Sequence, residues 1–385
     1  MHSTRSGFYP NRKVRATRRT TMQALLSANY TPLRCFTHKT VAESARFCYS
    51  ERMSSSKERQ QAIKKLRCMF FAPKLDVKAF RERIEATLYA PFLPNHVEAT
   101  DCDYGGILCD VLYPEMYASR KIAIYVHGGS FVAGSRRAYR SFCASLAHAI
   151  SCRIVVPEFR LAPAHPYPAA LEDVQAVFRA VYTEEQVARS LDADGDDTAA
   201  PELIIMADGS GASIALAVLM SMKERFRGAV SHVVLFSPWL DVSEKNKHLA
   251  PKKARDEVFT ADAIRRSAEL YTYQENQLNP LVSPLRASKD MLKGLPPIFI
   301  QLGEKELFLD DAEQFMANLK DAGSDCDIDM WKDMMPLFQL ADDALEESHL
   351  AIEKIGSMIT GRNVRKGESA VGIGIELEHS TYSEL

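Results

Sequence analysis

The sequence predicts an α/β protein whose parallel sheet is covered by helices on both faces. From about residue 105 onward, short runs rich in β-branched residues alternate with longer segments of helical pattern. The short runs show little alternation of polar and apolar residues, which is typical of strands buried on both faces. Strands that alternate with helices favour a parallel sheet, whose sites form at the carboxyl ends of the strands. The predicted strands are 122–126, 153–157, 203–206, 232–236 and 298–302, and the predicted helices are 138–150, 169–189, 211–226 and 310–322.

The chain begins with a basic segment. Its first 42 residues contain no Asp or Glu and are rich in Arg, Ser and Thr, a composition that resembles an organelle transit peptide. A flexible basic arm, or a translation start at Met22 or Met53, explains the same composition. We therefore interpret residues 1–56 as a flexible extension of a cytoplasmic protein.

Composition excludes several functional classes. The 385 residues carry a formal net charge of −2, so we expect no nucleic-acid binding. The eight cysteines include no pair at CxxC spacing, which argues against a zinc site, and we expect neither metal nor cofactor. The most apolar window, 203–222, holds Asp208 and two glycines. A charge there is costly in lipid, so we expect no transmembrane segment.

The helical segment 57–90 precedes the predicted sheet, and its apolar spacing predicts one or two amphipathic helices. A long insertion, 242–285, interrupts the alternation, and Thr260 within it is placed to cap a helix. We expect one domain over 57–360, with a lid from about 57–95 and 242–285, and a flexible tail over 361–385. The acidic stretch "DADGDD" (192–197) lacks the later Glu of a calcium loop and is interpreted as a solvated connection.

A glycine-rich motif, "YVHGGSFVAGS" (125–135), follows the first predicted parallel strand. Gly128 and Gly129 would let backbone N–H groups point at a ligand, as in the oxyanion hole of lipases and esterases. Neighbouring His127 and Ser130 belong to the same candidate binding loop. An ordinary glycine turn is the alternative interpretation.

Several longer motifs carry a family resemblance. "FRLAPAHPYPAALEDV" (159–174), "LFSPWLDVS" (235–243), "NPLVSPL" (279–285) and "LPPIFIQLGEKELFLDD" (295–311) resemble, in order, segments of the hormone-sensitive-lipase-like esterases. This resemblance covers about residues 75–358. It implies the α/β-hydrolase fold: an eight-stranded, mostly parallel sheet with helices on both faces and a helical lid.

The resemblance also implies where a Ser–acid–His triad would stand. The segment "ADGSGA" (207–212) places Gly209 at the nucleophile position, between Asp208 and Ser210. In "GEKELFLD" (303–310), Glu306 takes the place of the acid, and in "DMMPLFQL" (333–340), Pro336 takes that of the histidine. Gly has no oxygen to attack a carbonyl and Pro cannot accept a proton, and losing one such residue costs about 10⁶ in kcat.

The sequence therefore predicts a catalytically inactive relative of carboxylic-ester hydrolases that binds a small acyl or carboxylate compound or acts in regulation. Family resemblance also suggests a homodimer. Two alternatives remain open. One is a hydrolase that uses Ser210 as its nucleophile, although the candidate bases, His127 and His349, are poorly placed by sequence. The other is an interaction protein whose pocket is filled by side chains, with Met334 and Met335 as the expected fillers.

Overall fold

A computed structural model describes residues 54–361, except 73, 91–92, 94–95, 116–120, 192–200, 244, 247–255 and 342–343. All described residues belong to one structural unit. The predictions for residues 1–53, the acidic stretch 192–197 and the tail beyond Gly361 lie outside the described residues.

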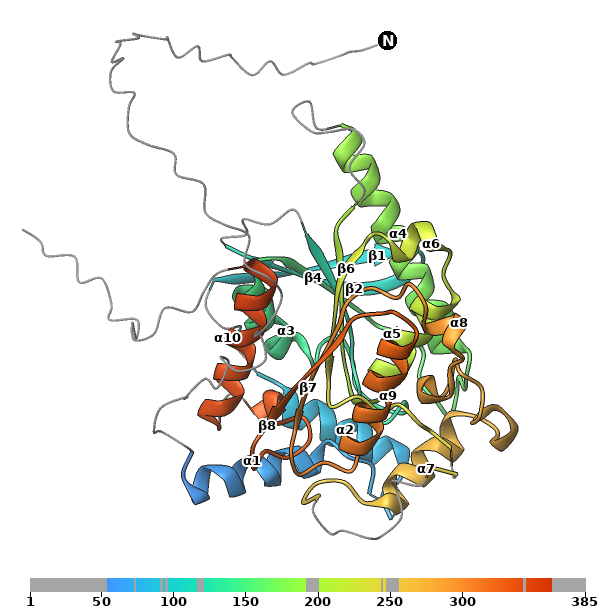
Figure 1. Cartoon of the computed structure of the whole chain (residues 1–385). Helices are drawn as coiled ribbons and strands as arrows, with labels where there is room; N and C mark the ends of the chain where they lie inside the picture. The colour runs from blue at the N-terminus through green and yellow to red at the C-terminus, as the bar shows by residue number, and fades with distance from the viewer. Residues whose placement is uncertain are drawn as a thin grey trace, which may run out of the picture. The chain divides into compact units, whose positions relative to one another are not determined.

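An eight-stranded sheet forms the centre of this unit (Figure 1), in the order β1-β2-β4-β3-β5-β6-β7-β8. Pairing is antiparallel for β1 with β2 and for β2 with β4, and parallel for all other neighbours. The mostly parallel sheet predicted from the sequence is confirmed. The strands are β1 (Val97–Tyr104), β2 (Ile107–Pro114), β3 (Ile122–Val126), β4 (Arg153–Pro157), β5 (Leu203–Asp208), β6 (Val230–Phe236), β7 (Ile298–Gly303) and β8 (Cys326–Trp331).

Helices cover both faces of the sheet (Figure 1). Helices α3 and α10 pack against each other on one face, while α4, α5 and α9 lie on the other, with the short α6 and α8 at its margin. Residues 209–219 of α5 are buried on every side, which explains the uniformly apolar sequence there. The bounds are α3 (Arg140–Ile150), α4 (Ala169–Ser190), α5 (Gly209–Ser221), α6 (Glu224–Arg227), α8 (Lys289–Leu292), α9 (Leu309–Asp321) and α10 (Glu346–Thr360).

Three further helices, α1, α2 and α7, gather beyond the carboxyl ends of the parallel strands (Figure 1). Each begins at a side-chain cap: Ser55 forms a capping box with Glu58, Asp76 accepts from the Ala79 N–H, and Thr260 accepts from the Ala263 N–H. The sequence predicted one or two N-terminal helices, and the structure has two; the predicted Thr260 cap is confirmed. Their bounds are α1 (Ser56–Cys68), α2 (Val77–Leu88) and α7 (Ala261–Tyr271).

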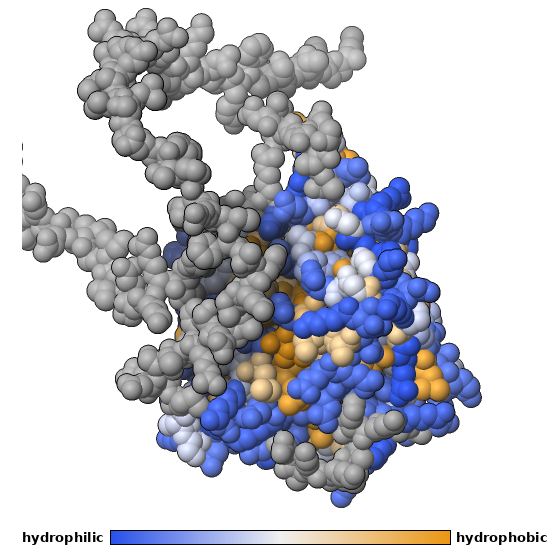
Figure 2. Space-filling view, viewed as in Figure 1, coloured by the Kyte–Doolittle hydropathy of each residue, from blue (hydrophilic) through white to orange (hydrophobic). Residues whose placement is uncertain are grey.

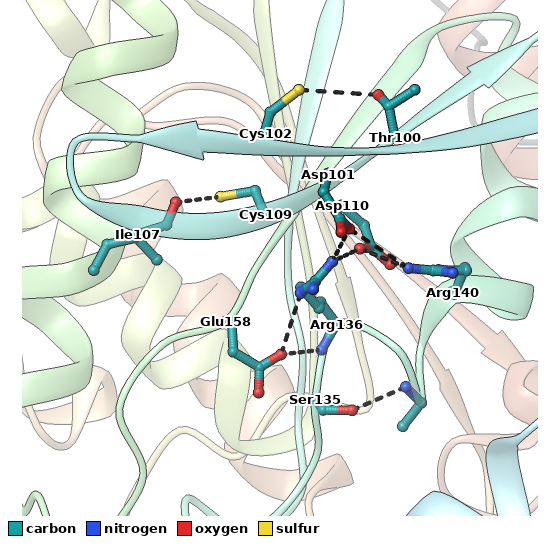
Figure 3. A network of polar contacts seen from close by, with 11 residues as sticks. Thr100, Asp101, Cys102, Ile107, Cys109, Asp110, Ser135, Arg136, Arg140 and Glu158 are labelled. Atoms are coloured by element: carbon teal, nitrogen blue, oxygen red, sulfur yellow. Dashed lines mark hydrogen bonds and ion pairs between the residues drawn. The ribbon is translucent and has the colours of Figure 1, made fainter.

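An ionic network joins the β1–β2 hairpin to the loop that follows β3 (Figure 3). The fully buried Asp110 carboxylate contacts Arg136, and its Oδ2 lies 2.6 Å from Arg140 Nε. Asp101 also pairs with Arg136, and the Arg136 N–H donates to Glu158 Oε2 over 3.0 Å. A buried charge needs such partners. The network therefore fixes the end of the glycine-rich loop against the sheet.

The visible surface of this face is mainly hydrophilic, with hydrophobic residues concentrated in its middle (Figure 2). Large exposed hydrophobic side chains include Met330 on β8 and Leu191 at the end of α4. Within the part of the chain that the structure describes, no helix is long and apolar enough to cross a membrane.

Candidate functional site

The turn between β5 and α5 lies where the carboxyl ends of three parallel strands meet. β3 pairs with β5 at Val126 and Ala207, and β5 pairs with β6 at Asp208 and Phe236. Gly209 follows at once with a φ of +46°, a left-handed conformation that residues with side chains seldom adopt. The chain thus forms the sharp strand-to-helix turn on which α/β hydrolases carry a nucleophile.

The two glycines of this turn meet very different surroundings. A Cβ atom on Gly211 would lie 2.2 Å from the carbonyl oxygen of Val126, so only glycine lets α5 pack this closely on β3. A Cβ atom on Gly209 would meet nothing closer than Leu337 Cδ1, at 3.8 Å. The turn therefore has room for a side chain at position 209, although none is present.

The Asp208 carboxylate ties this turn to the glycine-rich loop. Its Oδ1 accepts hydrogen bonds from Tyr125 Oη and the Gly128 N–H, each over 2.8 Å, and its Oδ2 accepts from Tyr139 Oη over 3.1 Å. Burial raises the pKa of Asp208 to about 6 despite these donors. Since Asp208 takes the Gly128 N–H, that group is engaged within the protein, in contrast to the expectation that it faces a ligand.

The next residues of the loop do face the site. Gly129, with a φ of +104°, and Ser130 both line the cavity described below. A Cβ atom on Gly129 would lie 2.1 Å from the Ala133 carbonyl oxygen, so this tight turn requires glycine. The Phe131 N–H donates to Ser210 Oγ over 3.1 Å. Ser210 thus stabilises the glycine-rich loop through this hydrogen bond.

His127 lies under the loop, in a fully buried position. Its ring stacks between Tyr139 and Phe159, with centroids 5.2 and 4.3 Å away, and its Nδ1 lies 2.8 Å from the Gly128 carbonyl oxygen. Burial lowers the pKa of His127 to about 4, so the imidazole is neutral at pH 7. These contacts match a supporting role for His127 in the loop.

Glu306 follows the carboxyl end of β7 and is nearly inaccessible to solvent. Its Oε1 accepts from Ser237 Oγ over 2.7 Å and from the Gly303 N–H over 2.5 Å. Its Oε2 has no hydrogen-bond partner among the described residues. Burial raises the pKa of Glu306 to about 8, so this carboxyl holds its proton at pH 7.

Pro336 is buried at the position that the resemblance assigns to the catalytic histidine. It offers no side-chain proton acceptor to Glu306 Oε2. The next residue, Leu337, donates its N–H to Ser237 Oγ over 2.9 Å and turns its side chain toward Gly209. A chain of contacts from Glu306 through Ser237 to Leu337 thus links the acid position to the turn without any titratable group between them.

The cavity over Gly209 is almost completely filled. Its volume is about 10 Å³, which is about the space for one water molecule. Aromatic rings close it: Phe70 and Phe259 have centroids 3.8 Å apart, and Phe308 lies 4.8 Å from Phe259. The lining residues are Met69, Phe70, Gly129, Ser130, Tyr139, Gly209, Ser210, Trp239, Phe259, Phe308 and Leu337.

The prediction that Met334 and Met335 fill this pocket is wrong. Both are buried, but neither lines the cavity. Their backbones instead pack against β7, where a Cβ atom on Gly303 would lie 2.3 Å from the Met334 carbonyl oxygen. Met69 and Phe70, which follow α1, line the cavity instead.

No arrangement for general-base catalysis surrounds Ser210 within the described residues. Its Oγ serves the Phe131 N–H, and a base must come within hydrogen-bond reach of the proton that it removes. His349 lies on α10, where its exposed ring pairs with Glu353 over 3.5 Å. The structure therefore brings Gly209, Ser210, Gly129 and Ser130 together and leaves His349 apart.

Sequence reasoning missed several residues that shape this site. Ser237, with a φ of +43°, bridges Glu306 and Leu337, and Trp239 lies against the cavity. Both belong to the "FSPW" segment at the carboxyl end of β6. Their position at a strand end could have identified them as site residues. Phe70 and Phe259 gave no such signal, because they reach the cavity from segments far apart in the chain.

Comparisons with known proteins agree with this geometry. A family described as alpha/beta hydrolase fold matches residues 123–340. An acetyl-hydrolase of Streptomyces hygroscopicus is 28% identical over 237 residues, covering 61% of this chain and 74% of that protein. An esterase of Acinetobacter venetianus is 27% identical over 244 residues, covering 63% and 76%.

Solved structures show the same likeness. The crystal structure of an esterase from the bacterial hormone-sensitive lipase family superposes with a TM-score of 0.69 and 28% sequence identity, covering 80% of this chain and 99% of that one. The family match over residues 123–340 begins within β3 and includes all later strands, β4 to β8. The chain therefore belongs to the alpha/beta hydrolase fold family and is a hormone-sensitive-lipase-like member of it.

Proposed function

We propose that this chain is a non-catalytic member of its family, a pseudo-esterase that acts in binding or regulation. The observation that carries the proposal is the pair of groups at the turn: Gly209 has no side chain, and Leu337 Cδ1 lies 3.8 Å from the place of its missing Cβ, where ester hydrolysis requires a hydroxyl beside an imidazole. The unpartnered Oε2 of the buried Glu306 supports it, because that oxygen is left without the basic partner that the acid of a triad orients.

The small volume of the cavity bears on the choice between small-molecule binding and interaction with another protein. A volume of about 10 Å³ admits no acyl chain without movement of the aromatic side chains. We therefore favour a protein that acts through its surface, as an interaction or regulatory protein, over one that holds a small acyl or carboxylate compound above Gly209. A residual effect of the loop and turn on an ester would be small, about 10³–10⁴ over water.

Active hydrolysis through Ser210 is the second candidate. The names of the relatives, an acetyl-hydrolase and an esterase, favour it, and Ser210 lines the cavity. It would require Ser210 Oγ to leave the Phe131 N–H and to find a base, whereas the buried His127 carries a lowered pKa of about 4.

Hydrolysis of p-nitrophenyl acetate and butyrate, together with labelling by a serine-directed fluorophosphonate, tests these functions. We expect the native chain and Ser210→Ala to give the same background rate and no label. Hydrolysis and labelling of the native chain that Ser210→Ala abolishes would overturn the proposal. A Gly209→Ser/Pro336→His variant tests the cavity: we expect it to stay inactive, and an active variant would mean that the pocket admits an acyl group.

A further inference from the structure

A second and larger hollow lies away from Gly209, between α1, α2 and the segment that precedes α7. It is open to solvent and has a volume of about 530 Å³, within the range of about 300–1,000 Å³ that is typical of small-molecule pockets. Among the described residues, this hollow therefore offers more space for a ligand than the cavity over Gly209.

Three of the seven residues that line this pocket are cationic. Lys64 and Arg67 project from α1 and Arg83 from α2, and Glu257 is the acidic residue of the lining. The Glu257 carboxylate is already paired, with its Oε2 2.9 Å from Nη1 of Arg59, which does not line the pocket. Three cations therefore line the hollow, and its one carboxylate is paired with a fourth cation, Arg59.

Backbone carbonyl groups hold the two arginines in place. Arg67 donates its Nε–H to the Glu257 carbonyl oxygen over 2.6 Å. Arg83 donates Nε–H and Nη2–H to the carbonyl oxygens of Cys68 and Phe70 over 2.9 and 2.6 Å. Among the described residues, the Nη atoms of Arg67 make no hydrogen bond, so they remain available to a ligand. A guanidinium held in advance loses less freedom when it binds.

We propose that this pocket binds a small organic anion through a phosphate or carboxylate group. The planar guanidinium of Arg67 matches the paired oxygens of such a group, and Arg83 and Lys64 add positive charge beside it. Ile63, which lies in the same lining, gives the carbon skeleton of the ligand an apolar contact. This binding does not depend on whether the chain hydrolyses esters.

The pocket also adjoins the segments that fill the cavity over Gly209. Arg83 holds the carbonyl group of Phe70, and Arg67 holds that of Glu257, two residues before Phe259. The Phe70 and Phe259 rings are the pair that closes the cavity. An anion on these arginines would therefore contact the supports of both aromatic side chains, which suits a regulatory ligand.

Isothermal titration calorimetry of the full chain with sodium pyrophosphate, and separately with citrate, tests the site at constant ionic strength against a chloride blank. We expect saturable binding that Arg67→Gln weakens at least about tenfold, the loss of one charge-assisted contact. Lys64→Gln, on an exposed position of α1, should weaken it as well. Lys57→Gln is the matched control, because it removes a charge from the same helix outside the pocket.

The two probes distinguish the ligand chemistry. Binding of pyrophosphate alone assigns the pocket to a phosphate group, and binding of citrate alone assigns it to carboxylates. Absence of saturable binding for both anions would overturn the proposal. So would binding that Arg67→Gln and Lys64→Gln leave unchanged, or that Lys57→Gln weakens equally, since the latter would indicate diffuse attraction to a charged helix.

Discussion

Leu337 lies beside Gly209 at the turn between β5 and α5, with Leu337 Cδ1 3.8 Å from the place of a Cβ atom on Gly209. The family resemblance puts an attacking hydroxyl at the first position and a histidine directly before the second. A glycine and an apolar side chain therefore stand where a proton would have to move between two polar groups. The backbone of the turn is nevertheless retained, which shows that its geometry does not depend on the nucleophile.

The difference between Gly209 and Gly211 predicts two different losses of stability. Gly209→Ala should lower the free energy of unfolding by about 1–2 kcal/mol, because only the left-handed backbone opposes the new methyl group. Gly211→Ala should cost about 3 kcal/mol or prevent folding, since its Cβ would lie 2.2 Å from the Val126 carbonyl oxygen. Urea unfolding followed by circular dichroism measures both, and equal losses would contradict the packing described here.

The aromatic closure predicts that one truncation opens the cavity. Phe70→Ala should lower stability by about 3–5 kcal/mol and should expose Trp239, which lines the cavity and is 3% exposed. Acrylamide quenching of fluorescence measures this in a Trp331→Phe background, because the chain has two tryptophans.

Phe80→Ala is the matched control for this experiment. Phe80 is fully buried on α2 and does not line the cavity. We expect a comparable loss of stability without increased quenching of Trp239. Quenching that rises equally in both variants would mean that general loosening, and not removal of the closing ring, exposes the tryptophan.

Buried Glu306 predicts a stability that falls as the pH rises. Its pKa is about 8 in the native state and near 4.5 without burial, so between these values the native state holds a proton that the unfolded state releases. Its contribution is therefore complete below about pH 4.5 and is lost as the pH rises through 8. Glu306→Gln should flatten the decline in the free energy of unfolding from pH 6.5 to 8.

Urea unfolding at several pH values measures this effect. Glu313→Gln, on the exposed side of α9, is the control and should leave the pH dependence as it is in the native chain. Burial also raises the pKa of Asp208 and of Asp256, each to about 6, so these groups change the free energy of unfolding mainly at lower pH. If Glu306→Gln left the slope above pH 6.5 unchanged, the carboxyl would not hold its proton there.

The ionic network of Figure 3 predicts unequal roles for two aspartates that contact the same arginine. Asp110→Asn should lower the free energy of unfolding by about 3–5 kcal/mol, because it leaves the charge of Arg136 without its buried partner. Asp101→Asn should cost much less, since its side chain is 59% exposed and solvent screens its charge. Thermal unfolding of both variants checks the order, and a larger loss for Asp101→Asn would refute it.

The parallel centre of the sheet could be predicted from the sequence, because strands buried on both faces are apolar throughout. The residues 122–126 and 153–157 form strands with the predicted bounds. The hairpin β1–β2 and the edge strand β8 were missed; β1 and β8 mix polar with apolar residues because each has a side that meets solvent. Helix α5 begins at Gly209, two residues before the predicted start, and ends at Ser221.

By itself, the sequence determined which chemical groups this chain has at the catalytic turn: a glycine and a proline stand where the resemblance places serine and histidine. Only the tertiary structure decided what occupies the space that they leave. Phe70 and Phe259, nearly 190 residues apart in the chain, meet over Gly209, and Gly128 gives its N–H to Asp208. Spacing along one segment reveals the chemistry of that segment, but contacts between distant segments depend on how the whole chain packs.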